Sequence, residues 1–129
     1  MAVKKKLKII KIVVDDDVFR AKVLIYVNCT NEYFDKELEK KYDTVVPKVS
    51  GTAGNFVSFE TEDGTMYCLW LERFDKSVYR LGVLNHELIH CTYSILNDRG
   101  IEINDETEEV LAYYHTFLLT EAYKKLIKT

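Results

Sequence analysis

The segment KSVYRLGVLNHELIHCTYSILNDRG, residues 76–100, carries a helical pattern of about six turns. No glycine or proline interrupts residues 83–99, and Gly100 suits the position just beyond a helix C-terminus. One face of this helix repeats apolar residues at helical spacing: Leu84, Leu88, Cys91 and Ile95. The pattern therefore predicts a long helix that packs this face on a core.

The same helix carries His86, Glu87 and His90 in the order HExxH. Residues four apart share one helical face, so both imidazoles can reach a single zinc ion at about 2.0–2.1 Å. Glu87 lies about 100° further round, where a carboxylate can act as general base towards water. The alternative interpretation is two ordinary histidines that happen to lie one helical turn apart.

The rest of the sequence predicts one α+β domain over residues 1–129. Apolar runs at residues 7–14 and 18–28 indicate strands, and residues 31–42 have helical spacing, with Asn31 as N-cap. Residues 43–55 indicate a loop, marked by its proline and glycines. The expected architecture is a small mixed β-sheet with one early helix, followed by two long helices.

Two local signals complete this architecture. Residues 55–74 predict a hairpin, with Asp63 and Gly64 suited to a type I′ turn. Residues 105–128 predict the second long helix, with Asp105 as N-cap and Glu108 completing a capping box. If Glu108 is used in the cap, Glu109 remains free for another role.

Composition narrows the classes of function. A net charge of -3 gives no basic surface for nucleic acid. The apolar run near the N-terminus is broken by Lys8 and Lys11, which fits neither a signal peptide nor a membrane span. The three cysteines are odd in number and form no CxxC pair, which favours free thiols and a cytoplasmic protein.

A catalytic zinc site needs a third ligand, and the residues alone leave its identity open. The metzincin pattern requires a histidine at position 96, which is Leu96. His115 could serve in principle, as could a glutamate of the following helix.

The HExxH motif and the glutamate after it resemble the gluzincin branch of the zincin metallopeptidases. Eighteen residues separate His90 from Glu109, the spacing found in gluzincin aminopeptidases and one short of that in thermolysin. The run from residue 86 to 118 is also similar to small phage and prophage proteins with an HExxH helix and an acidic ExxAY helix. The likeness covers residues 77 to about 120.

This resemblance implies a zincin-like domain with one Zn²⁺ per chain, bound by His86, His90 and Glu109. It implies a metallopeptidase-like hydrolase that cleaves a peptide or protein substrate, with Glu87 as general base. It further implies the cytoplasm of a phage-infected or lysogenic bacterium. Neither nucleic acid nor membrane is expected as a partner, and the oligomeric state stays open.

The chain also departs from the gluzincin pattern. Tyr113 stands where those enzymes commonly place a supporting aspartate. The residue that would stabilise the oxyanion stays open among four candidates: Tyr93, Tyr113, Tyr114 and His115. A sheet edge in the 55–74 hairpin, with residues 51–55 at its mouth, is expected to bind substrate as an added strand. The alternative function is a non-catalytic, metal-stabilised interaction module.

Overall fold

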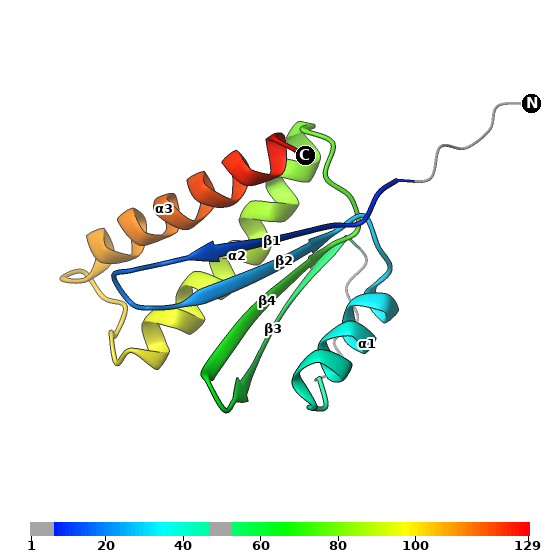
Figure 1. The fold of residues 1–129 in the computed structure, drawn as a ribbon. Helices are drawn as coiled ribbons and strands as arrows, with labels where there is room; N and C mark the ends of the chain where they lie inside the picture. Colours follow the sequence, from blue (N-terminus) through cyan, green and yellow to red (C-terminus); the bar gives the residue numbers. More distant parts are fainter. Residues whose placement is uncertain (1–6, 47–52) are drawn as a thin grey trace, which may run out of the picture.

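The computed structural model describes residues 7–46 and 53–129, and Figure 1 shows their arrangement. Its elements, in chain order, are β1 (Ile10–Asp15), β2 (Lys22–Val27), α1 (Asn31–Tyr42), β3 (Gly54–Thr61), β4 (Gly64–Leu71), α2 (Val78–Asp98) and α3 (Glu108–Ile127). The loop expected at residues 43–55 falls partly outside the described residues, and Gly54 already belongs to β3.

The four strands form a mixed sheet in the order β1-β2-β4-β3. β1 and β2 are antiparallel, β2 and β4 are parallel, and β3 and β4 are antiparallel. The sheet, the early helix and the two long helices make a mixed α+β fold, as the sequence predicts. β1 and β3 are the two edge strands of the sheet.

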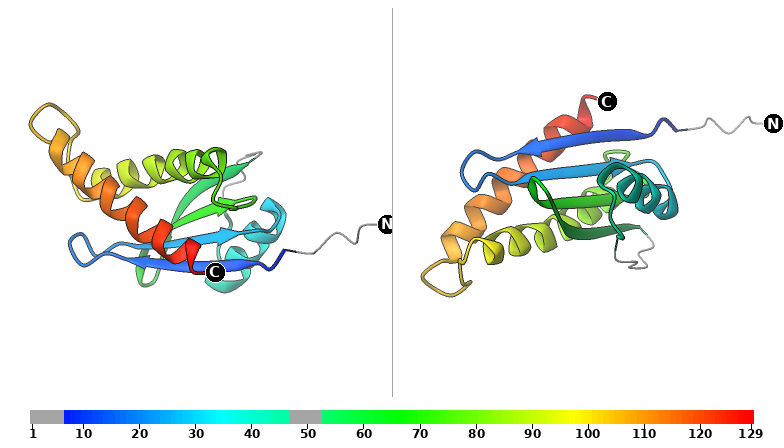
Figure 2. Two further views of the ribbon diagram at one scale, coloured as in Figure 1. Left: turned by 90° about the horizontal axis from the view of Figure 1, so that it is seen from above. Right: turned by 60° about the horizontal axis from the view of Figure 1, so that its bottom comes forward.

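Helices cover both faces of this sheet. Figures 1 and 2 show α2 and α3 on one face and α1 on the other. The central strands are therefore buried on both sides, with alternate residues facing opposite layers. The α2–α3 layer encloses one apolar cluster, which includes Ile25 and Leu69, and the α1 layer encloses a second, which includes Tyr26 and Trp70.

The ends of α2 follow local sequence signals. The Ser77 hydroxyl accepts a hydrogen bond from the Arg80 N–H at 3.2 Å and caps the N-terminus. Gly100 has a φ of 76°, its N–H bonds to the Asn97 carbonyl, and the Ile101 N–H bonds to the Leu96 carbonyl. These are the two bonds of a Schellman motif, so the predicted role of Gly100 is confirmed.

Two predicted local features are wrong, the N-cap of α1 and the turn of the hairpin. The N-cap of α1 is Thr30 rather than Asn31, because the Thr30 hydroxyl accepts from the Tyr33 N–H at 3.1 Å. In the hairpin, Thr61 pairs with Gly64, so the turn does not centre on Asp63 and Gly64. Among residues 61–64 only Gly64 has positive φ, at 110°, whereas a type I′ turn needs it at two successive residues.

The predicted Asp105–Glu108 capping box is also wrong. The side chain of Asn104 accepts from the Glu106 and Thr107 N–H groups, and the Thr107 hydroxyl accepts from the Asn104 N–H. This reciprocal pair lies one residue before the expected box and forms the turn that precedes α3, whose N-cap residue Thr107 makes no side-chain cap bond. Both Glu108 and Glu109 then stand in the first turn of α3, so capping does not single out Glu109.

No helix among the described residues is both long enough and apolar enough to span a bilayer.

Candidate active site

His86 and His90 lie together on the exposed side of α2. Their ring centroids are 5.0 Å apart, and the rings are nearly perpendicular at 79°. The His86 side chain is 70% exposed, and His90 is also exposed. The opposite face of the helix is fully buried through the predicted residues Leu84, Leu88, Cys91 and Ile95. A rigid, packed helix therefore presents both imidazoles to solvent.

Glu87 has a different environment, although it lies between the two histidines in sequence. Its relative exposure is 8%, and its Oε1 lies 3.9 Å from His86 Nε2. Burial raises the pKa of the Glu87 carboxyl above its ordinary value of 4.5, and the neighbouring His86 and His90 oppose this shift. A carboxylate with a raised pKa accepts a proton more readily than an exposed one.

Gly54 explains how Glu87 becomes buried. A β-carbon at Gly54 would lie 3.0 Å from Glu87 Cγ, 2.9 Å from Val83 Cγ1 and 3.1 Å from the Trp70 carbonyl oxygen. The start of edge strand β3 therefore packs directly against the Glu87 flank of α2, at a distance that only glycine permits. In sequence Gly54 indicates only a loop, so its contact with Glu87 was missed.

His115 occupies the seam between α2 and α3. Its Nδ1 lies 2.9 Å from the Thr92 hydroxyl, and its Nε2 lies 2.7 Å from Asn85 Oδ1. Burial lowers the pKa of His115, which favours the neutral ring. Since both ring nitrogens already have partners, His115 joins the two helices and is not free to bind a metal. No local pattern in the sequence indicates the roles of Asn85 and Thr92.

Glu109 is exposed in the first turn of α3. It precedes His115 by six residues, which places it about 120° around the helix from the side that meets α2. Among the described residues no three His, Cys, Asp or Glu side chains form a group able to hold a metal. Residues 1–6 and 47–52 contain none of these four residue types.

The described residues therefore fit zinc only in part. Two exposed imidazoles at i and i+4 are suitable donors. The third donor expected from Glu109 is not beside them, so the predicted ligand set of His86, His90 and Glu109 stays a prediction.

The four oxyanion candidates separate clearly by environment. The Tyr114 hydroxyl donates to Asp16 Oδ2 at 2.8 Å in a buried contact, and His115 has the partners described above. Tyr93 and Tyr113 are 45% and 74% exposed. Tyr93 follows His90 by three residues on the same side of α2, so it is the better placed of the two.

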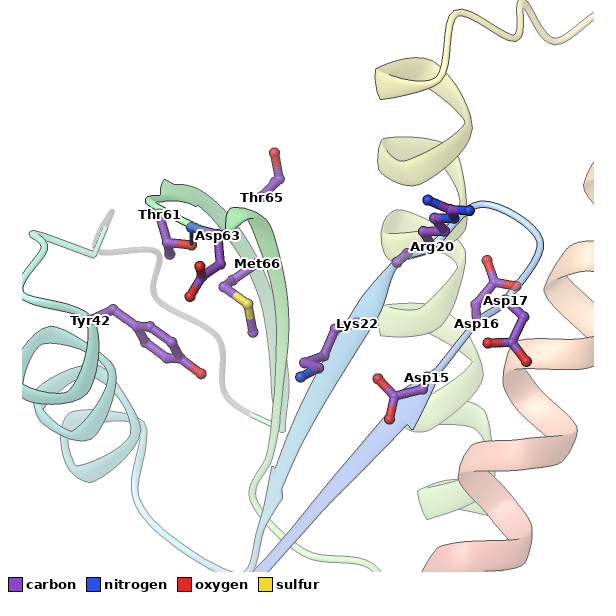
Figure 3. Close-up of a pocket in the computed structure, with 11 residues that line it drawn as sticks. Asp15, Asp16, Asp17, Arg20, Lys22, Tyr42, Thr61, Asp63, Thr65 and Met66 are labelled. Atoms are coloured by element: carbon purple, nitrogen blue, oxygen red, sulfur yellow. Dashed lines mark hydrogen bonds between the residues drawn. The ribbon is translucent and has the colours of Figure 1, made fainter.

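A separate hollow of about 790 Å³ lies between the β1–β2 and β3–β4 turns (Figure 3). It gathers several aspartates, but Arg20 and Lys22 also line it. The Asp16 carboxylate already accepts from the Val18 and Phe19 N–H groups as well as from Tyr114. This hollow therefore has no unsatisfied buried carboxylate to bind a cation.

No family model, curated protein or solved structure matches the chain in the comparisons.

Proposed function

We propose that the protein is a zinc-dependent, metallopeptidase-like hydrolase whose site is built on His86, Glu87 and His90. The observation that carries this proposal is the contrast within one helical turn. Two imidazoles are exposed at metal-binding spacing, while the carboxylate between them is buried, with a raised pKa. A chance pair of surface histidines would not require a desolvated glutamate beside it.

His86 and His90 would hold the ion, and bound zinc would supply Lewis-acid polarisation of a carbonyl and an activated water. Glu109 is the proposed third ligand, on the strength of the eighteen-residue spacing. Because it is exposed in the first turn of α3, its recruitment requires that turn or its side chain to move towards α2.

Glu87 would perform the proton transfers. Its carboxylate oxygen would take a proton from the attacking water and return it to the leaving amine, and the raised pKa makes it a stronger base for the first of these two steps. Packing of Gly54 against the Glu87 Cγ holds this side chain at the edge of the sheet.

The substrate would be a peptide or protein segment in extended conformation. β3 is an edge strand that begins beside Glu87, so a segment paired with it would run past the site. Tyr93 is the proposed group for stabilising the oxyanion, since its side chain is exposed one turn beyond His90.

The test combines metal content with hydrolysis. The wild-type chain should bind about one zinc per chain in calorimetric titration and cleave members of a mixed peptide library in mass spectrometry. Glu87→Gln should keep zinc and lose about 100- to 10,000-fold in cleavage rate, the usual contribution of general acid–base catalysis. Glu121→Gln, a change at a partly exposed residue of α3 outside the proposed site, is the matched control. Absence of zinc binding in the wild type would contradict the proposal.

A second candidate function is a non-catalytic, metal-stabilised interaction module. In such a module the exposed imidazoles of His86 and His90 would bind the metal, and Glu87 would have no role in proton transfer. Zinc binding without any cleavage, and with no difference between wild type and Glu87→Gln, would support this alternative.

A further inference from the structure

A hollow of about 530 Å³ lies directly beyond the histidine pair along α2. It is lined by the last turns of α2, including Tyr93 and Asn97, and by residues 100–103 of the following loop. Tyr93 follows His90 by three residues, which is about 4.5 Å along the helix axis. The hollow therefore begins one helical turn from the proposed site, and its volume is in the range of small-ligand pockets.

The one charged side chain in the lining of this hollow is acidic. Glu102 lines it, and no lysine, arginine or histidine does so among the described residues. The surrounding acidic turn, residues 98–109, holds six carboxylates and one basic residue, Arg99. Arg99 is engaged elsewhere, because its Nε donates to the Phe19 carbonyl at 2.8 Å. A cation in the hollow would meet no competing positive charge from its lining.

The loop that carries Glu102 is held on both sides. The Ile101 N–H donates to the Leu96 carbonyl at 2.9 Å, closing the Schellman motif. On the other side, the Thr107 hydroxyl donates to the carbonyl of Glu102 itself. The backbone of Glu102 is thus fixed by hydrogen bonds, which lowers the entropy cost of binding there.

We infer that this hollow binds a lysine or arginine side chain of the peptide on which the neighbouring site acts. The inference rests on the proposed function for the identity of that peptide. Ile101 and Ile103 provide apolar surface for the aliphatic stem. The Glu102 carboxylate and the face of the Tyr93 ring then suit the charged end, through an ion pair and a cation–π contact. A neutral apolar side chain would use only the isoleucines.

The experiment uses the full chain and decapeptides that are otherwise uncharged and carry one lysine at each successive position. Matched series replace that lysine with arginine, citrulline or norleucine. Binding is measured without zinc, from shifts of the Gly100–Ile103 amide resonances, and cleavage is measured with zinc. The lysine and arginine peptides should bind about three- to tenfold more tightly than the neutral ones, as expected for one exposed ion pair with a cation–π contact.

Two matched variants test the role of the carboxylate. Glu102→Gln should reduce the preference for lysine over norleucine by about two- to fivefold, the usual range for an exposed ion pair. Glu106→Gln, in the same acidic turn but outside the lining, should leave it unchanged. Equal binding of lysine and norleucine peptides, or equal effects of the two variants, would overturn the inference. Charge-dependent binding at these amides without cleavage would support the cation site while refuting the proposed hydrolase.

Discussion

The three histidines of this chain fall into two regions that differ in their partners. His86 and His90 stand on the exposed side of α2, where their rings contact each other and His86 Nε2 lies 3.9 Å from Glu87 Oε1. His115 lies in the α2–α3 seam with a partner at each ring nitrogen. An imidazole can bind a metal only through a ring nitrogen that has no hydrogen-bond partner. The hydrogen-bond partners of each histidine therefore determine whether it can be a metal ligand.

The two regions also contribute to different free energies, that of zinc binding and that of unfolding. The exposed pair contributes little to packing, and its removal should leave the fold intact. His115 joins α2 to α3 and shields the buried Thr92, so its removal should weaken the fold directly. Metal affinity and unfolding free energy therefore report on different histidines.

The largest expected effect is on zinc affinity. His90→Ala should weaken zinc binding by more than about 100-fold, which exceeds the usual cost of removing a residue that only supports a ligand. The unfolding midpoint of the zinc-free chain should barely change, because His90 is exposed. Calorimetric zinc titration and thermal unfolding measure both quantities. Unchanged zinc affinity in both His86→Ala and His90→Ala would show that the exposed pair does not bind zinc, so the two regions would not differ in this role.

The next effect is on stability. His115→Ala should lower the unfolding free energy by about 1–3 kcal/mol, since Asn85 and the buried Thr92 each lose a hydrogen-bond partner. Zinc affinity should stay close to that of the wild type. Chemical denaturation with a parallel zinc titration provides the measurement. Loss of zinc binding in a folded His115→Ala chain would show instead that His115 is a ligand.

A smaller effect concerns two adjacent glutamates at the start of α3. Glu109→Ala should weaken zinc binding by at least about tenfold, whereas Glu108→Ala should not. The N-cap residue of α3 is Thr107 and no side chain caps this end of the helix, so neither change removes a cap and both variants should unfold at similar midpoints. If only Glu108→Ala loses zinc, the third ligand lies one residue earlier than proposed.

The smallest effect is a pH dependence of stability. Burial lowers the pKa of His115 in the folded state below its ordinary 6.5, so the unfolded chain takes up a proton first as the pH falls. The His115 contribution to stability is therefore present above about pH 6.5 and decreases on acidification below it. Unfolding free energies across this range should fall more steeply for wild type than for His115→Gln. Equal slopes would show that His115 is not desolvated.

The sequence by itself determined much of the local structure. Its periodicity predicted α2, α3 and the early helix, its alternating runs predicted the strands, and Gly100 marked the end of α2. It also determined that His86 and His90 share a helical face backed by a buried stripe. Such features depend on residues within about four positions of one another, so they can be derived from local spacing.

Only the tertiary structure decided which side chains near the motif are buried and which have hydrogen-bond partners. Glu87 is buried because β3 brings Gly54 against it, although the two are far apart in sequence. His115 is engaged by Asn85, 30 residues away, and by Thr92, 23 residues away. Glu109 is exposed because the Asn104–Thr107 turn sets where α3 begins and how it is rotated. These contacts depend on how the layers pack, and spacing along the chain does not encode that packing.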